Sequence, residues 1–158
     1  MKICNRTFSK AQILSKNFSS FGDVDAITMD SQKKLQFDLI INATSIGINN
    51  LKFDLPNNFF KKETVCYDMS YGKAANSFMD WAKKNDLKFY NGLGMLLEQA
   101  ADSFYIWEQK RPLITDELRS ILNKQLLPIF FFIINYTIFK FFKFLSFTHI
   151  LYDVRNAY

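Results

Sequence analysis

The side chain of Gln99 is suited to recognise a hydroxylated ligand. It follows the run Asn91-Gly92-Leu93-Gly94-Met95, which predicts a glycine turn that leads into a helix. A glutamine amide can donate and accept hydrogen bonds, and backbone at Gly92 and Gly94 can approach a flat ring closely. Met95 begins the helix, one turn before Gln99 on the same face. A glutamine in a helix is most often simply exposed to solvent, so both interpretations stay open from the residues alone.

Positive charge near the start of the chain indicates a phosphate ligand. Lys2-Ile3-Cys4 predicts a short strand, Asn5, Arg6 and Thr7 follow it, and Lys10 lies one turn into the next helix. In a doubly wound fold, an acid at the end of the second strand binds the ribose of NAD, whereas a nearby arginine accommodates the 2′-phosphate of NADP. No acid stands here, and the planar fork of Arg6 suits phosphate. A lone basic loop is more often only a solvated surface.

Two more polar turns directly follow apolar runs. Thr44 and Ser45 follow the first run, and Met69 and Tyr71 follow the second. Ligands of open α/β sheets bind at the carboxyl ends of the strands, so Thr44 and Ser45 either line a cofactor or cap the turn. Met69 offers adaptable apolar surface to a flat ring or belongs to the core. Tyr71 has a hydroxyl free to meet a polyol or a carboxylate.

Strand patterns alternate with helical patterns along the chain, which predicts an α/β fold with a parallel sheet. The expected strands are 2–4, 25–28, 37–43, 64–69 and 87–90, and the expected helices lie near 7–18, 77–84, 93–109 and 115–122, with a helical turn near 55–58. The run 37–43 is almost continuously apolar, which is typical of a parallel strand buried on both faces. None of the five glycines forms a G-x-G-x-x-G after a strand. We therefore expect the first strand and the pyrophosphate loop of such a fold to lie outside this chain, to the detriment of cofactor affinity.

Composition excludes several other classes of function. The net charge of +5 is spread along the chain without a block of like charges, so we expect no nucleic-acid partner. Cys4 and Cys66 lie in apolar runs, where core packing is favoured over a disulfide or a metal site. The one histidine is His149, so the rest of the chain holds no histidine acid–base chemistry. No secretory signal precedes the first strand, and the expected location is cytoplasmic.

The chain divides by composition into residues 1–124 and a Phe/Ile/Lys-rich tail, residues 125–158. Residues 128–152 are long enough to span a membrane, yet Lys140 and Lys143 near the middle are costly there. An interfacial helix, an extra packed helix, and a non-native or weakly structured tail that arose from a lost stop codon or a frameshift are the alternatives. The last is favoured, and we assign no chemistry to the tail.

Several separate motifs occur in one order, and together they make residues 2–124 resemble the cofactor-binding half of shikimate dehydrogenases. The motifs are Asn5-Arg6-Thr7, Phe37-Asp38-Leu39-Ile40-Ile41-Asn42-Ala43-Thr44-Ser45, Tyr67-Asp68-Met69 with Tyr71, Gly92-Leu93-Gly94-Met95-Leu96 with Gln99-Ala100-Ala101, and Trp107 followed by Pro112. The resemblance implies an incomplete Rossmann-like NAD(P)-binding domain that lacks its first βα unit. It also implies the reduction of 3-dehydroshikimate to shikimate with NADPH, in the route to chorismate and the aromatic amino acids.

The resemblance also implies roles for individual residues. The expected NADP-binding set is Asn5, Arg6, Thr7, Lys10, Thr44, Ser45, Met69, Gly92 and Met95, and the residues expected to touch shikimate are Tyr71 and Gln99. Asn91 stands where an aspartate is common in the family and Asn76 where a threonine is common, and neither change forbids function. The family's substrate domain, with its catalytic lysine, has no counterpart in the chain. We therefore assign no catalytic residue and no metal ligand here.

Three functions remain open at this point. The first is the NADP-binding part of a shikimate dehydrogenase, active only within a longer protein or a complementing pair. The second is a non-catalytic gene remnant or NADP-binding module, which could attach to a membrane through its tail. The third is a quinate/shikimate dehydrogenase relative. A sheet without its first strand exposes apolar edges, so we expect self-association of the chain.

Overall fold

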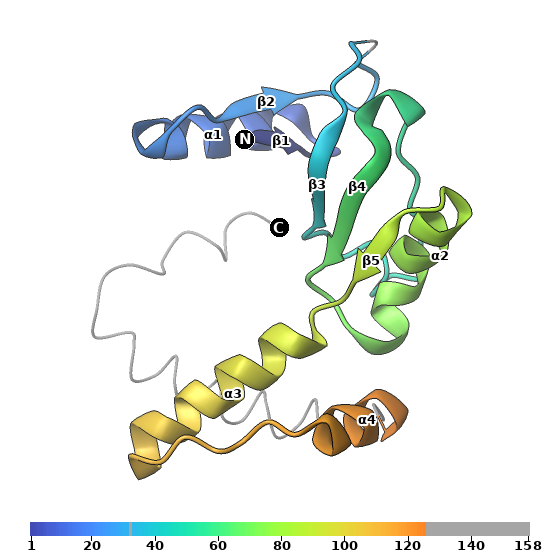
Figure 1. Cartoon of the computed structure of the whole chain (residues 1–158). Helices are drawn as coiled ribbons and strands as arrows, with labels where there is room; N and C mark the ends of the chain where they lie inside the picture. Colours follow the sequence, from blue (N-terminus) through green and yellow to red (C-terminus); the bar gives the residue numbers. More distant parts are fainter. Residues whose placement is uncertain (32, 126–158) are drawn as a thin grey trace. The chain divides into compact units, whose positions relative to one another are not determined.

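The computed structural model describes residues 1–31 and 33–125 (Figure 1). These residues fall into two compact units, with the division after Ile27. The first unit holds β1 (Lys2–Cys4), α1 (Phe8–Phe18), the 3-10 turn η1 (Ser19–Phe21) and β2 (Asp25–Ile27). The second holds β3 (Phe37–Asn42), η2 (Asn57–Phe59), β4 (Phe60–Asp68), η3 (Gly72–Ala75), α2 (Asn76–Lys84), β5 (Lys88–Tyr90), α3 (Leu93–Glu108) and α4 (Asp116–Gln125).

The first unit is a single βαβ arrangement. Its two strands pair in parallel, and α1 connects them. Ala11 is the small residue through which α1 is buried. The Ser15 hydroxyl donates to the Val24 carbonyl at 2.6 Å, which ties the helix to the segment just before β2. This unit therefore relies on one close helix approach rather than on large buried side chains.

The second unit is built on a three-stranded parallel sheet with the order β3-β4-β5 (Figure 1). Leu39 lies opposite Val65 and Asn42 opposite Asp68, so the register runs evenly to the end of both strands. A register shift precedes Leu39. Thr64 satisfies the backbone there, because its buried hydroxyl donates to the Phe37 carbonyl at 2.6 Å.

An aromatic cluster joins α2 to this sheet. Phe78 and Trp81 are buried on α2, and their rings stack with centroids 5.6 Å apart. The Phe78 ring also meets Phe89 of β5 at 5.9 Å and Phe53 at 4.6 Å. Offset and edge-on ring contacts of this kind add to the free energy of burying the rings. The core of the second unit thus lies between α2 and the β4–β5 side of the sheet.

The structure confirms the predicted α/β class, the parallel pairing and the order of strands and helices. Two details differ. β4 begins at Phe60, before the start of the predicted strand at Thr64. The prediction that the run 37–43 is buried on both faces was wrong, since Leu39 is 51% and Ile41 56% exposed. The physical reason is that β3 is an edge strand of its sheet among the described strands, and one of its faces has no cover.

The remaining predictions about the chain as a whole have different outcomes. Among residues 1–31 and 33–125, neither Cys4 nor Cys66 is joined in a disulfide, and no group of metal-ligating side chains occurs; the expected absence of a metal stays a prediction. Within the same residues, no helix is long and apolar enough to cross a membrane. The tail interpretations and His149 lie outside the described residues. The domain boundary after residue 124 and the cytoplasmic location stay predictions.

Candidate ligand-binding site

A buried amide–carboxylate pair marks the carboxyl end of the sheet in the second unit. Asn42 ends β3, Asp68 ends β4, and the two residues lie opposite each other in register. The Asn42 Nδ2 donates to Asp68 Oδ2 at 3.0 Å. Asn42 is 4% and Asp68 0% exposed. Because a buried carboxylate is costly unless it is hydrogen-bonded, this pair fixes the ends of both strands at one level.

The same pair organises the loops that follow the two strands. Asn42 Oδ1 accepts from the Thr44 hydroxyl at 2.7 Å and from its N–H at 3.1 Å. Asp68 Oδ1 accepts from the Ser70 N–H at 2.7 Å, and the Met69 N–H donates to the Asn42 carbonyl at 3.0 Å. The Asn42 side chain thus caps the turn after β3, and the Thr44 hydroxyl donates its proton within that turn. The loops at this edge are held by side chains to which sequence reasoning assigned no role.

Gly92 brings the third loop against the second. Its N–H donates to the Ser70 carbonyl at 2.8 Å, and a Cβ at this position would collide with the Met69 carbonyl oxygen. Glycine is therefore required for the close approach of the two backbones. Asn91 Oδ1 accepts from the Leu93 N–H at 3.1 Å, so the Asn91 side chain holds the first turn of α3. Met69, which is 45% exposed, and Gly92 thus lie together.

The loop after β3 approaches η3 just as closely. A Cβ at Gly47 would collide with the Ala74 carbonyl oxygen. Ser45 precedes this contact and is exposed, and its hydroxyl accepts from the Asn49 Nδ2 at 3.2 Å. Tyr71 directly precedes η3 and is half-buried. The loops after all three strands of this sheet therefore gather at its carboxyl edge, where open α/β sheets bind ligands.

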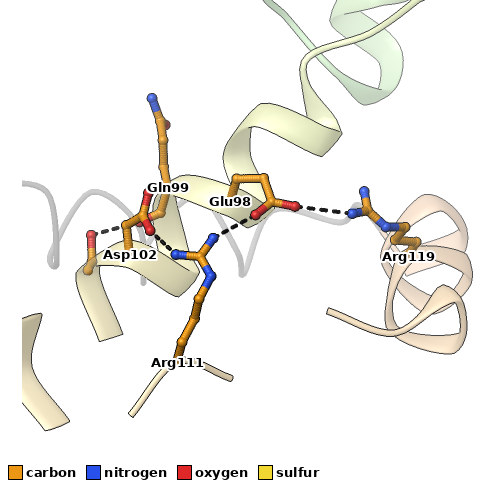
Figure 2. Close-up of polar contacts among 6 residues, drawn as sticks. Glu98, Gln99, Asp102, Arg111 and Arg119 are labelled. Carbon is orange, nitrogen blue, oxygen red and sulfur yellow. Dashed lines mark hydrogen bonds and ion pairs between the residues drawn. The ribbon is translucent and has the colours of Figure 1, made fainter. Parts of the chain in front are cut away.

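The two predicted site residues on α3 have different surroundings. Met95 is half-buried, whereas Gln99 is exposed. Figure 2 shows the Gln99 side chain directed away from a charged network formed by its neighbours. In that network Arg111 binds Glu98 at 2.8 Å and also pairs with Asp102, and Arg119 binds Glu98 at 3.3 Å. The network leaves the Gln99 amide available to a ligand.

This network ties α3 to the segment that leads into α4. A hollow of about 360 Å³ lies beside it, lined by Glu98, Arg111, Pro112, Leu113, Ile114 and Arg119. None of the predicted site residues lines this hollow. The arginines already have carboxylate partners, so we assign the network a structural role on α3. No pattern in the sequence indicates these pairs, because Arg111 lies 9 and 13 residues from its partners.

The basic loop of the first unit sits at the carboxyl end of β1. Asn5, Arg6, Thr7 and Lys10 are all exposed. The Asn5 Oδ1 accepts from the Thr7 N–H at 2.8 Å, which makes an Asx turn into α1. Thr7 is the N-cap residue of α1. The loop thus presents a guanidinium at the end of a strand without an acid, which is the arrangement that suits a 2′-phosphate.

Cys66 does not contribute a nucleophile. It lies in β4 two residues before Asp68 and is fully buried. Burial raises the pKa of its thiol from 9.0 to about 11. The thiolate is the reactive form of cysteine, so this side chain is core, as predicted.

Comparison with known proteins identifies the relatives of this arrangement. Residues 92–115 match the model of the shikimate 5′-dehydrogenase C-terminal domain. The NADP(+) shikimate dehydrogenase of Cellvibrio japonicus is 41% identical over 125 residues, which cover 78% of this chain and 45% of that protein. The chain spans less than half the length of this curated relative.

Solved structures agree. A crystal structure of a shikimate dehydrogenase in complex with NADP+ superposes with a TM-score of 0.64 at 32% identity, covering 78% of this chain and 46% of the other. The Thermus thermophilus enzyme in complex with NADP(H) and shikimate gives 0.56 at 28% identity, covering 71% and 41%. Parallel strands, intervening helices and polar loops at the carboxyl edge define an α/β protein of the Rossmann-like class. Within that class, the chain is similar to the C-terminal part of shikimate dehydrogenases.

Proposed function

We propose that this chain supplies the NADP-binding part of a shikimate dehydrogenase, an oxidoreductase that reduces 3-dehydroshikimate to shikimate with NADPH. The observation that carries the proposal is the carboxyl edge of β3, β4 and β5. There Asn42, Asp68 and Gly92 hold three loops together around Met69. The 41% identity to an NADP(+) shikimate dehydrogenase supports the same assignment.

The cofactor contacts follow from the chemistry of the loops. Arg6 and Lys10 offer positive charge to the 2′-phosphate of NADP, next to Asn5 and Thr7. In the second unit the cofactor would lie along the residues Thr44, Ser45, Met69, Gly92 and Met95. The exposed thioether of Met69 beside glycine backbone is a flat apolar surface suited to a nicotinamide ring.

The substrate contacts are Tyr71 and Gln99. Both side chains carry groups that donate and accept hydrogen bonds, which suits the hydroxyls and the ketone of the substrate. The hydride comes from the cofactor. Proton transfer to the reduced oxygen needs a positioned acid–base group, and we assign none of this chain's residues to that step. The proposed role of the chain is to bind and orient both ligands.

Binding of 2′,5′-ADP tests the cofactor assignment without any need for turnover. We expect the chain to bind 2′,5′-ADP at least tenfold more tightly than 5′-ADP by calorimetry, because only the former carries the 2′-phosphate. Arg6→Gln is expected to remove that preference, while Lys16→Gln, a loss of charge at the far end of α1, leaves it unchanged. Equal binding of the two nucleotides by the unmodified chain would contradict the assignment.

Activity of the purified chain tests the substrate half of the proposal. We expect no shikimate-dependent reduction of NADP+ above a mock purification, because the acid–base group is not assigned within these residues. Turnover clearly above the mock would show that the chain catalyses the reaction alone. The division of roles proposed above would then be wrong.

A further inference from the structure

Asn42 and Asp68 hold their hydrogen-bond partners in one fixed direction. The Thr44 N–H can only donate, and it donates to Asn42 Oδ1 at 3.1 Å. That contact turns Asn42 Nδ2, which also can only donate, toward Asp68 Oδ2 at 3.0 Å. Asp68 Oδ1 then accepts from the Ser70 N–H at 2.7 Å. Because each contact fixes the donor and acceptor roles in the next, the amide and the carboxylate cannot be changed one at a time.

The series of contacts continues to the loop before α3. The Ser70 carbonyl accepts from the Gly92 N–H at 2.8 Å, and the Met69 N–H donates to the Asn42 carbonyl at 3.0 Å. A Cβ at Gly92 would collide with the Met69 carbonyl oxygen. The backbone of Met69 is thus held from both sides, and its side chain, 45% exposed, emerges from this fixed segment.

The pair itself is closed to a ligand. Asn42 is 4% and Asp68 0% exposed, and the side-chain oxygen and nitrogen atoms of both residues have protein partners. Buried polar groups cost free energy unless they are hydrogen-bonded, and a fully satisfied buried network fixes one arrangement of its surroundings. The pair therefore acts on the loops that it joins rather than on a ligand directly.

We propose that Asn42 and Asp68 are positioning residues for the nicotinamide end of NADP, on which they act through Met69 and Gly92. Their contacts keep the Met69 thioether beside the backbone of Gly92, the surface assigned above to the nicotinamide ring. This inference rests on the proposed function for the identity of the ligand. Recognition of the 2′-phosphate is assigned to the loop at Arg6, so the pair sets the position of the ring and leaves phosphate recognition unchanged.

Exchange of the two side-chain types provides the decisive variants. With Asp68→Asn alone, two amides face each other, and one N–H of the series loses its acceptor whichever way they turn. Adding Asn42→Asp restores every contact. The carboxylate at position 42 then accepts from Thr44 and from the amide at position 68, whose oxygen accepts from the Ser70 N–H. The double variant also keeps the net charge and nearly the same side-chain volumes.

NMR of the full chain with NADP+ as the probe observes the two ends of the cofactor separately. The Met69 methyl reports the ring through its shift and through contacts with the nicotinamide protons, and the Arg6 amide reports the 2′-phosphate. We expect Asp68→Asn to reduce the Met69 response at saturation at least threefold, while the Arg6 response changes less than twofold. The double variant with Asn42→Asp is expected to recover the Met69 response to within twofold.

A milder variant guards against misfolding of Asp68→Asn. In Asn42→Ser the shorter hydroxyl reaches either Asp68 or the Thr44 N–H but not both, so the Met69 response is again expected to fall. Trp81 fluorescence in a Trp107→Phe background reports whether each variant is folded, since these are the two tryptophans of the chain.

The outcomes separate the positioning role from the function. Loss of the Met69 response in a folded single variant, with recovery in the double variant and a constant Arg6 response, supports the inference. An unchanged Met69 response, an equal loss at Arg6, no recovery in a folded double variant, or failure of both single variants to fold would overturn it. An unmodified chain in which NADP+ leaves Met69 unaffected contradicts the proposed function instead, and the inference falls with it.

Discussion

β3 and β4 are neighbouring strands of one sheet, yet their side chains are buried to very different extents. β4 pairs on both sides, and Thr64, Cys66 and Asp68 are fully buried along it. β3 pairs on one side among the described strands, and Leu39 and Ile41 are exposed. The comparison shows that an apolar run predicts a strand suited to burial. It does not show which other segments bury its side chains.

The polar residues that end the two strands, in contrast, are buried to a similar extent. Asn42 and Asp68 are both buried, and each satisfies the other. The open strand and the covered strand therefore end in one rigid edge, where the proposed ligand site lies. β3 thus has an unpaired side and a carboxyl end whose polar groups are hydrogen-bonded. The two features are compatible because strand pairing acts across the strand, whereas the proposed ligand site lies at its end.

Truncation of a side chain that covers the sheet is expected to have the largest effect. Phe78→Ala removes a buried ring that contacts Phe53, Trp81 and Phe89, and should lower the free energy of unfolding by about 3–5 kcal/mol. Leu39→Ala, on the open face, should lower it by less than about 1 kcal/mol, because the side chain is already half in water. Urea unfolding followed by Trp81 fluorescence measures both. Equal losses would break the comparison.

Removal of an aspartate from each strand tests the same difference in burial with a polar side chain. Asp68→Ala leaves the Asn42 amide and the Ser70 N–H without their acceptor, which should cost about 2–3 kcal/mol of stability. Asp38 of β3 is exposed, and its hydrogen bond and charge interaction with Lys61 hold its pKa below the usual value. Surface ion pairs contribute little, so Asp38→Ala should have no measurable effect on the urea midpoint. A larger loss at Asp38 than at Asp68 would contradict the burial described for both.

The buried thiol of β4 predicts a dependence on alkaline pH. Burial raises the pKa of Cys66 to about 11, above the 9.0 of an exposed thiol. The folded state therefore keeps a proton that the unfolded state releases, so stability is full below pH 9 and falls as the pH rises toward 11. The loss attributable to this group reaches about 3 kcal/mol, because the two pKa values differ by two units and each unit is worth about 1.4 kcal/mol.

The control for this pH dependence is Cys66→Ala. The variant loses stability at neutral pH, but the additional decline between the two pKa values, 9.0 and about 11, should shrink relative to the unmodified chain. An identical decline in both proteins would show that Cys66 is not the source.

A charge on the exposed face of β3 should have the smallest effect on stability. The same charge on buried β4 should have a large one. Leu39→Lys is expected to change the free energy of unfolding by no more than about 0.5 kcal/mol, because the position is exposed. It should nevertheless reduce self-association, since charged side chains protect open sheet edges. Sedimentation velocity at several concentrations measures this. Cys66→Lys on the covered strand is the counterpart that should fail to fold.

Much of the fold could be predicted from the sequence because local periodicity carries it. The alternation of apolar runs and helical patterns located the strands and helices of both units, and the polar turns after each run located the loops at the carboxyl edge. Gly92 and Met69 were expected to contact one ligand, and the structure places their backbones together. Their part in binding NADP stays a prediction.

The features that escaped prediction depend on distant parts of the chain. The Asn42–Asp68 pair joins residues 26 apart, and its signal was the polar residue that ends each of two neighbouring strands. The exposure of Leu39 and Ile41 cannot be read from an apolar run, because the same run would suit a buried strand. The Arg111 contacts depend on how α3 and the following segment fold back.

Residue-resolved amide exchange along β3, measured by NMR on the full chain, tests the central comparison most directly. The account predicts an alternation, in which the amides of Ile40 and Asn42 are protected by β4 while those of Leu39 and Ile41 exchange rapidly. Strong protection at all four amides would show that a strand already occupies the open side of β3. The contrast between β3 and β4 would then be wrong.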